Sequence, residues 1–77
     1  MNELKEVHTG TIIWFKRRGH GFIEWFKEGI RQKDMFVHYS GIVGDGFKML
    51  KPGNLVNFEI GTNYKGQPIA INVSLKE

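Results

Sequence analysis

Two segments decide the fold: Arg18-Gly19-His20-Gly21-Phe22-Ile23 and Met35-Phe36-Val37-His38-Tyr39. Both are typical of β-strands, in which successive side chains point to opposite faces of the sheet. The aliphatic side chains of Ile23, Met35 and Val37 then share the face that a core would bury. The rings expected on the opposite face are those of His20, Phe22, Phe36 and His38. The sequence therefore predicts an aromatic surface across two neighbouring strands.

Positive charge lies beside the first of these segments. Lys16 and Arg17 directly precede Arg18. Flat rings next to positive charge can stack nucleobases while the phosphate backbone is neutralised. The whole chain has 11 Lys and Arg against 8 Asp and Glu, a formal net charge of +3 and a pI of about 9.4. Charge alone leaves two interpretations open, a polyanionic partner or a solvated turn.

Length and composition indicate one small domain. The 77 residues are too few for two cores, so we expect a single domain over residues 1–77 with its core within about residues 7–75. There is no cysteine, which excludes a disulfide and a thiolate metal site. The N-terminus has mixed charge, unlike a signal peptide, and no apolar run approaches the ~18 residues of a membrane span. We expect a soluble, cytoplasmic protein without a membrane partner.

Short strands separated by turns account for most of the chain. The apolar and β-branched pattern predicts strands at residues 7–16, 20–26, 34–38, 55–60 and 69–75. Residues 27–33 are expected to form a loop, and the glycine-rich residues 41–53 a long connection. Five short antiparallel strands in so small a chain predict an all-β fold closed into a barrel, because closure removes exposed strand edges.

Alternation along the strands separates the expected core from the surface. The apolar residues expected in the core near the C-terminus are Val56, Phe58, Ile60, Ile69, Ile71 and Val73. Trp14 and Phe15 are adjacent and cannot easily share one face, so at least one of them should lie in the binding surface. Further on, Trp25 is expected to cap the core and Phe26 to extend the face of Phe22.

Several motifs, in order along the chain, resemble the cold-shock domain family. Trp14-Phe15 and residues 18–23 are similar to that family's Trp-Phe pair and its Lys-Gly-Phe-Gly-Phe-Ile ribonucleoprotein motif, and Phe36-Val37-His38-Tyr39-Ser40 resembles its second motif. Later segments are similar to further parts of the family pattern. The family's loop between its third and fourth strands resembles Asp45-Gly46-Phe47-Lys48 and Pro52-Gly53. Its closing strands resemble Val56-Asn57-Phe58-Glu59-Ile60, Lys65-Gly66 and Asn72-Val73. The likeness covers about residues 9–75.

This resemblance implies a five-stranded antiparallel oligonucleotide-binding (OB-fold) barrel that binds single-stranded RNA and DNA. Because stacking favours open strands over duplexes, we expect an RNA chaperone or a regulator of transcription or translation, with a role in the cold-shock stress response. We also expect a monomer without cofactor, metal or small-molecule substrate. The aromatic residues carried over as base-stacking are Trp14, Phe15, His20, Phe22, Phe36, His38, Tyr39 and Phe47. The residues carried over as contacts to the backbone or to base edges are Lys16, Arg18, Lys65 and Gln67.

The chain also departs from the family pattern. His20 replaces a phenylalanine, which gives a smaller ring whose protonation would add positive charge. Ile13 replaces a lysine and Lys16 replaces an asparagine, so positive charge moves along the first strand. The segment 24–33 is longer than in compact bacterial members.

Two other classes of function fit the sequence less well. An enzyme is not expected, because His8, His20 and His38 lack metal-ligand spacing and Gly44-Asp45-Gly46 lacks the rest of a phosphate-binding fingerprint. The alternative is a small β-barrel module for protein–protein interaction, since exposed aromatic residues also anchor peptides. Quenching of Trp14 fluorescence by an oligonucleotide, weaker at higher salt, would distinguish nucleic-acid binding from peptide binding.

Overall fold

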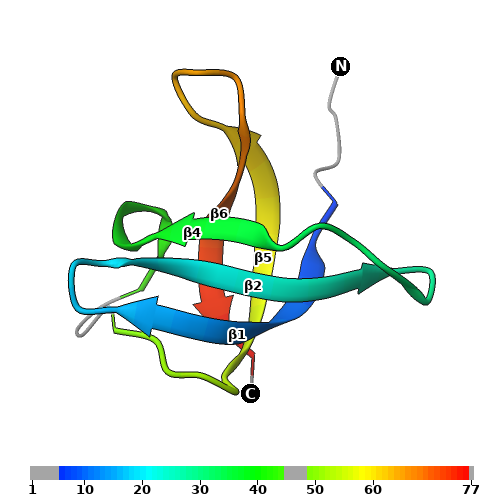
Figure 1. Cartoon of the computed structure of the whole chain (residues 1–77), viewed down its shortest axis with the longest axis horizontal. Helices are drawn as coiled ribbons and strands as arrows, with labels where there is room; N and C mark the ends of the chain where they lie inside the picture. The colour runs from blue at the N-terminus through cyan, green and yellow to red at the C-terminus, as the bar shows by residue number, and fades with distance from the viewer. Residues whose placement is uncertain (1–5, 45–48, 77) are drawn as a thin grey trace.

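Six β-strands and one short 3₁₀ turn form the regular structure of residues 6–44 and 49–76, the part of the chain that the computed structural model describes (Figure 1). The elements are β1 (His8–Lys16), β2 (His20–Lys27), β3 (Ile30–Arg31), β4 (Met35–His38), the 3₁₀ turn η1 (Tyr39–Gly41), β5 (Leu55–Thr62) and β6 (Pro68–Leu75). All five predicted strands are present close to their predicted bounds. The short strand β3 lies within the segment predicted as a loop.

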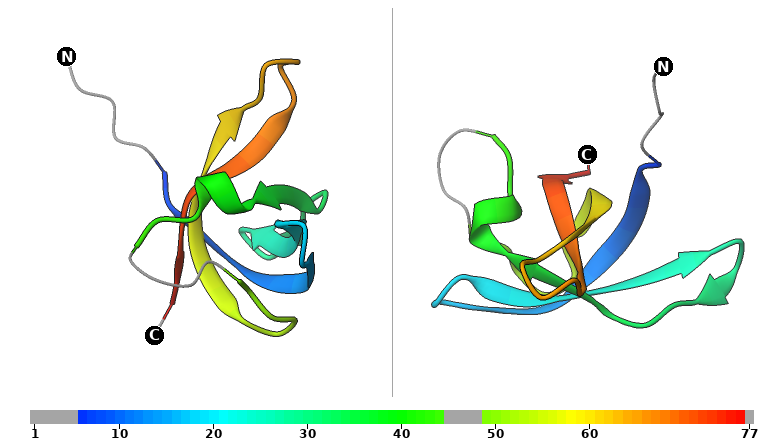
Figure 2. Two further views of the ribbon diagram at one scale, coloured as in Figure 1. Left: turned by 90° about the vertical axis from the view of Figure 1, so that its left-hand side faces the viewer. Right: turned by 90° about the horizontal axis from the view of Figure 1, so that it is seen from above.

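Five of these strands close into a barrel. They pair in the order β1-β5-β6-β4-β2, and a further pairing of β1 with β2 completes the ring. This confirms the predicted all-β, five-stranded OB-type barrel. The expectation of wholly antiparallel strands is wrong in one place, because β4 and β6 run parallel, with Val37 opposite Ala70. After η1 the chain crosses to β5, and β6 then returns from the β5–β6 hairpin in the same direction as β4 (Figures 1 and 2).

Apolar side chains from all five barrel strands and from the connection after β4 form the core. Its buried residues are Ile12, Phe15, Ile23, Trp25, Met35, Val37, Ile42, Leu50, Val56, Phe58, Ala70 and Val73. Burial alternates residue by residue through β4 and through β2 as far as Trp25, with Ile23, Met35 and Val37 pointing inward as predicted. The other side chains of β2 and β4 are therefore directed to solvent.

The predicted core is partly wrong in the last two strands. Ile60 is 38% exposed, and Ile69 and Ile71 are half-buried, whereas Ala70 and Val73 are buried. For Ile69 and Ile71 the cause is a β-bulge: the pairing of β5 with β6 shifts register between Asn57 and Glu59, opposite Asn72, whose φ is 51°. A bulge inserts one unpaired residue and breaks the two-residue alternation on which the prediction depended. Ile60 keeps the parity of the buried Val56 and Phe58, but it lies near the end of β5, where the strand runs on into the β5–β6 hairpin.

Residues 27–33, predicted as a loop, form part of an ordered hairpin with the end of β2. β2 continues to Lys27 and pairs with β3, so that Phe26 lies opposite Arg31 and Lys27 opposite Ile30. The two connecting residues, Glu28 and Gly29, have φ values of 53° and 80°. Positive φ at both central residues is the signature of a type I′ turn, whose twist matches the strands that it joins. The hairpin projects to the right in Figure 1, and the β5–β6 hairpin projects upward.

Glycine at position 21 allows β1 and β2 to lie close together. Gly21 is buried and pairs with Phe15. A Cβ atom at this position would overlap the carbonyl oxygen of Trp14 and lie 2.9 Å from the Cα of Phe15. Both neighbours are backbone atoms, so the clash can be relieved only by separating the two strands.

We predict that Gly21→Ala lowers the free energy of unfolding by about 2 kcal/mol or more, because overpacking against backbone forces the strands apart. Chemical denaturation followed by far-UV circular dichroism measures this loss. Tyr64→Ala is the control, because Tyr64 is 92% exposed and should change stability by less than about 0.5 kcal/mol. Equal stability of Gly21→Ala and the unmodified chain would contradict the close packing of β1 on β2.

Candidate nucleic-acid interface

Four aromatic rings from β1, β2 and β4 form one continuous surface, which we call the aromatic platform: Trp14, His20, Phe22 and Phe36. Each ring touches the next around a closed cycle. The centroid distances are 5.3 Å for Trp14–Phe22, 5.7 Å for Phe22–Phe36, 6.0 Å for Phe36–His20 and 6.0 Å for His20–Trp14. All four rings are half-buried, so each supports its neighbours and still presents atoms to solvent.

A β-bulge in β1 decides which of the two adjacent aromatic residues joins the platform. Pairing of β1 with β2 shifts register between Ile12 and Trp14, so Ile13 is the extra residue. After this bulge Trp14 lies opposite Phe22 on the outer face, and Phe15 turns inward. Trp14 is therefore the member of the pair that lies on the outer face, next to Phe22.

Phe15 was predicted to stack a base, but the structure places it in the core. Only 8% of its surface is exposed, and it belongs to the core cluster. Its ring packs inside the barrel, beneath the strand that carries Trp14. Phe15 therefore stabilises the platform from below and has no free face for a base.

His38 and Tyr39 extend the aromatic surface beyond the platform. His38 lies opposite His20 in the pairing of β2 with β4, and its ring centroid is 4.5 Å from that of Tyr39. The backbone N–H of Ser40 donates a hydrogen bond to Nδ1 of His38 at 3.2 Å, and the Ser40 hydroxyl is 2.8 Å from the same nitrogen. An N–H donor needs an unprotonated acceptor, so in this arrangement Nε2 carries the hydrogen of the imidazole.

A glycine holds Tyr39 in its position. The backbone N–H of Tyr39 donates to the carbonyl of Gly19 at 2.7 Å, and the ring covers Gly19 so closely that a Cβ there would overlap it. Gly19 also has a φ of 98°, which side chains rarely tolerate. The β1–β2 turn and the end of β4 are thus packed together at one end of the platform.

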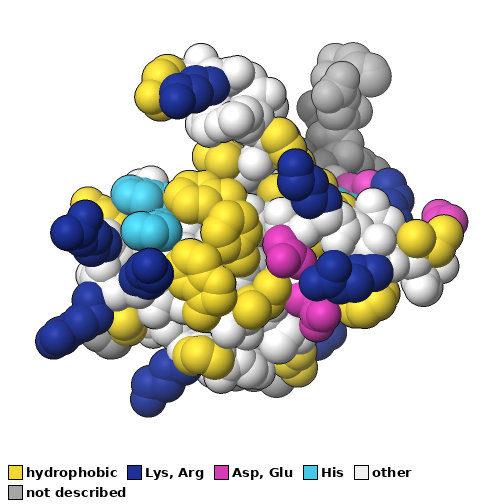
Figure 3. Space-filling model, in the orientation of Figure 1, with side chains coloured by type: hydrophobic (Ala, Val, Ile, Leu, Met, Phe, Trp, Pro, Cys, Tyr) yellow, Lys and Arg dark blue, Asp and Glu magenta, His cyan; other side chains and the backbone are white. Residues whose placement is uncertain are grey.

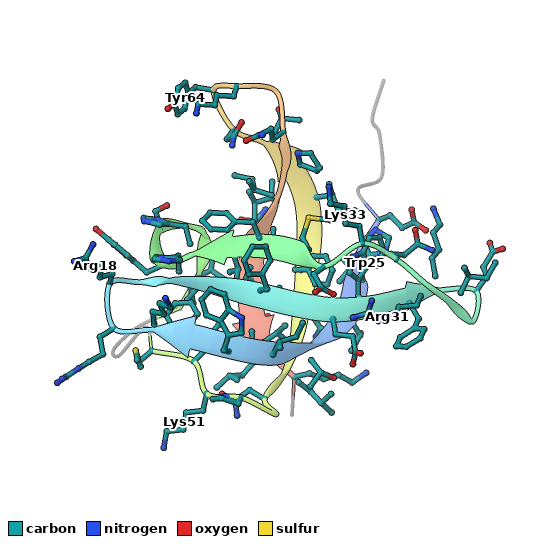
Figure 4. All side chains as sticks on the ribbon, viewed as in Figure 1. Arg18, Trp25, Arg31, Lys33, Lys51 and Tyr64 are labelled. Atoms are coloured by element: carbon teal, nitrogen blue, oxygen red, sulfur yellow. The ribbon has the colours of Figure 1, made fainter. Side chains whose placement is uncertain are left out.

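Basic side chains surround that same end. Nζ of Lys16 lies 5.3 Å from the centroid of the Trp14 ring, and Arg17 and Arg18 are exposed in the β1–β2 turn. Figure 3 shows a group of histidine, Lys and Arg side chains to the left of the central hydrophobic patch, and Figure 4 places Arg18 at the outer end of the turn. An approaching phosphate backbone would meet positive charge here first.

A groove runs along the other side of Phe22 and Phe36. Its volume is about 680 Å³, and it extends to the base of the β5–β6 hairpin. The polar residues in its lining are Gln32, Lys33, Asp34, Asn63 and Gln67. Donors and acceptors beside a stacking surface are suited to reading the edges of unpaired bases.

Two predicted contact residues come from the β5–β6 hairpin. Gln67 lines the groove, and its Oε1 accepts a hydrogen bond from Nδ2 of Asn63 at 3.2 Å. Lys65 is exposed at the tip, with Nζ 5.7 Å from the centroid of the Tyr64 ring. Lys65 is therefore separated from the platform by the length of the hairpin, whereas Gln67 borders it. Phe47 lies outside the described residues.

Sequence reasoning missed several residues of this region. Tyr64 is almost fully exposed, and Gln32, Lys33 and Asn63 line the groove. An aromatic residue between Asn63 and Lys65 in a polar turn was a usable signal for Tyr64, because the core has no access to a hairpin tip. Gln32 and Lys33 had no such signal, since their places depend on the hairpin formed by β2 and β3.

Other kinds of site lack support in the residues that the structure describes. Within residues 6–44 and 49–76 no group of three or more His, Cys, Asp or Glu side chains is placed to hold a metal ion. The same residues include no helix that is long and apolar enough to cross a membrane.

Fold and surface together define the class of protein: a closed five-stranded barrel that presents aromatic and basic side chains on one face, as nucleic-acid-binding OB folds do. Sequence comparisons identify the family. The family described as 'Cold-shock' DNA-binding domain matches residues 8–76. This chain belongs to the cold-shock domain family, whose members bind nucleic acid and are not enzymes.

Curated relatives agree with this assignment. Cold shock-like protein CspD of Bacillus cereus is 48% identical over 69 residues, which cover 88% of this chain and 97% of the relative. Cold shock-like protein CspC of Escherichia coli (strain K12) is 46% identical over 66 residues, covering 84% and 90%. Cold shock-like protein CspLB of Listeria monocytogenes is 48% identical over 61 residues, covering 78% and 86%. The matches span nearly the whole of each relative.

The two tryptophans should respond differently to a collisional quencher. Trp14 is half-exposed on the platform, whereas Trp25 is 6% exposed and donates through Nε1 to the carbonyl of Lys33 at 2.9 Å. We predict that acrylamide quenches the fluorescence of Trp14 and largely spares that of Trp25. Trp14→Phe should therefore remove most of the quenchable emission, and Trp25→Phe should retain it. The reverse pattern would contradict the assignment of Trp14 to the outer face.

Proposed function

We propose that this protein binds single-stranded RNA and DNA by stacking bases on the aromatic platform, with the phosphate backbone held by the basic side chains beside it. The observation that carries this proposal is the closed cycle of four solvent-facing rings next to Lys16, Arg17 and Arg18. Stacking suits every base, since each has a π-face, whereas the basic residues supply attraction that does not depend on sequence.

The proposed contacts divide into three groups. Bases stack on the aromatic platform and on the adjoining rings of His38 and Tyr39. Lys16 and Arg18 contact the phosphate backbone at the β1–β2 turn, and Lys65 contacts it from the β5–β6 hairpin. Gln67, with its neighbours in the groove, forms hydrogen bonds with base edges and gives a modest preference among sequences.

A few stacked bases are enough to give useful affinity for a single strand. Each base stacked on an aromatic side chain contributes roughly 1–3 kcal/mol. Four such contacts, less the cost of ordering a flexible strand, correspond to dissociation constants of about micromolar to nanomolar. Duplexes should bind poorly, because their bases are already stacked on one another. The protein would then trap open strands, which is the action of an RNA chaperone that needs no ATP and of a regulator that exposes transcripts.

A single barrel carries all the proposed contacts, so we propose that a monomer is the binding unit. The absence of cysteine is compatible with the reducing cytoplasm that we propose as its location. Peptide binding is the alternative use of exposed rings, and it requires no basic border. The basic residues beside the aromatic platform therefore favour nucleic acid.

We predict that Phe22→Ala combined with Phe36→Ala weakens binding of a short oligothymidine by about 30-fold or more, because two base stacks of roughly 1–3 kcal/mol each are lost. The change in anisotropy of a fluorescently labelled oligonucleotide measures the affinity. The unmodified chain should also lose affinity as salt rises. Binding releases cations from the phosphates, and this release is less favourable at high salt.

Leu75→Ala is the matched control, because Leu75 is exposed at the end of β6 and lies outside the proposed contacts. It should bind like the unmodified chain. Circular dichroism of the double variant verifies that the barrel is still folded. If the folded double variant bound as tightly as the control, base stacking on the aromatic platform would have to be abandoned.

A further inference from the structure

The hairpin of β2 and β3 carries an exposed ring on the same side as the platform. Burial alternates regularly along β2 from His20 to Trp25, which is buried. Phe26 follows Trp25 and is 52% exposed, so it lies on the outer face shared by Phe22 and Glu24. At the rise of a β-strand, the Cα atoms of Phe22 and Phe26 are about 13 Å apart. The aromatic line of β2 thus continues past the platform.

An arginine lies beside Phe26 on the same face of the hairpin. Arg31 lies opposite Phe26 in the pairing of β2 with β3. Its Nε lies 3.3 Å from Oε2 of Glu24, and its Nη2 donates to Oδ1 of Asp34 at 2.9 Å. Figure 4 shows Arg31 over the outer part of β2, and Figure 3 shows acidic and basic side chains side by side to the right of the hydrophobic patch.

The two ion pairs of Arg31 make this region a poor site for a phosphate and a suitable one for a base. Two carboxylates offset the charge of Arg31, so it offers little attraction for a phosphate. They also hold the guanidinium in one orientation while about half of the side chain stays exposed. A guanidinium plane accepts a stacked base much as an aromatic ring does. The region is therefore suited to the flat face of a base.

The hairpin is held firmly enough to present a defined surface. Nε1 of Trp25 donates to the carbonyl of Lys33 at 2.9 Å, and the backbone N–H of Gln32 donates to the carbonyl of Trp25 at 3.0 Å. The Trp25 ring packs on Phe58 and His8, with centroid distances of 5.6 and 4.7 Å. The side chain that precedes Phe26 thus anchors the hairpin in the core.

We propose that Phe26 and the guanidinium plane of Arg31 form a further stacking subsite for the same single strand, beyond the end of the platform at Phe22. This subsite rests on the proposed function, and its occupant is one additional base or more of that strand. Continuity with the aromatic platform along β2 favours nucleic acid over a peptide. Because two carboxylates offset the positive charge of Arg31, the subsite offers no cation of its own to a phosphate, and its contribution should depend little on salt, unlike the contacts at the β1–β2 turn.

A length series tests this subsite. Labelled oligothymidines of about 4 to 10 nucleotides lie within the range that one OB fold covers. We expect Phe26→Ala to bind the shortest of them like the unmodified chain, and to bind the longest about tenfold more weakly, through loss of one stacked base. Phe26→Leu, which keeps apolar bulk without a π-face, should behave like Phe26→Ala, and Phe26→Tyr should behave like the unmodified chain.

Ile30→Ala is the matched control, since Ile30 is 66% exposed on the same hairpin but lies opposite Lys27, away from the face of Phe26. It should leave the whole series unchanged. If Phe26→Ala and the unmodified chain had the same dependence on length, the subsite would be disproved while the proposed function stood. If the unmodified chain bound none of the oligonucleotides, both would fail together.

Discussion

The close antiparallel pairing of β1 with β2 is the constraint on which the rest of the structure depends. It closes the barrel, and it needs a residue without a Cβ at position 21, where Gly21 faces the backbone of Trp14 and Phe15. The same pairing contains the bulge at Ile13, which turns Trp14 outward and Phe15 inward. Closure and the presentation of Trp14 beside Phe22 are therefore consequences of a single strand pair.

The outer face of that pair is divided by charge. At the β1–β2 turn, exposed basic side chains lie beside Trp14 and directly before His20 in the sequence, where they can meet phosphates. At the β2–β3 hairpin, Arg31 is balanced by Glu24 and Asp34. A nucleic-acid strand bound across this face would be held by its phosphate backbone at the β1–β2 turn and by its bases at the β2–β3 hairpin. Such an arrangement would align the strand along β2 and allow its bases to be read from the groove.

Much of the fold and of the aromatic platform could be predicted from alternation in two short segments. His20, Phe22, Phe36 and His38 lie on the outer face because β2 and β4 are regular where these residues occur. The family resemblance supplied the OB-type barrel. The residues brought together by barrel closure, such as Trp14 and Phe22, could be placed only because both belonged to known motifs.

The wrong faces assigned in β6 and at Phe15 share one physical cause, which is local departure from two-residue alternation. The bulge at Asn72 reverses the expected faces of Ile69, Ala70 and Ile71, and the bulge at Ile13 buries Phe15. Neither bulge has a glycine or proline to mark it. The type I′ turn at Glu28 and Gly29 was missed because glutamate rarely adopts positive φ. The parallel pairing of β4 with β6 joins strands that are far apart in the sequence, and alternation within a strand carries no information on the direction of its partner.

Side-chain NMR of the aromatic rings during titration with a short oligothymidine tests the central claim most directly. Stacked bases shift the resonances of the rings that they cover. We predict large shifts for Trp14, Phe22 and Phe36 on the outer face, and small ones for Phe58 and Trp25 in the core. Binding that left the platform resonances in place, or moved only rings elsewhere on the barrel, would contradict the account.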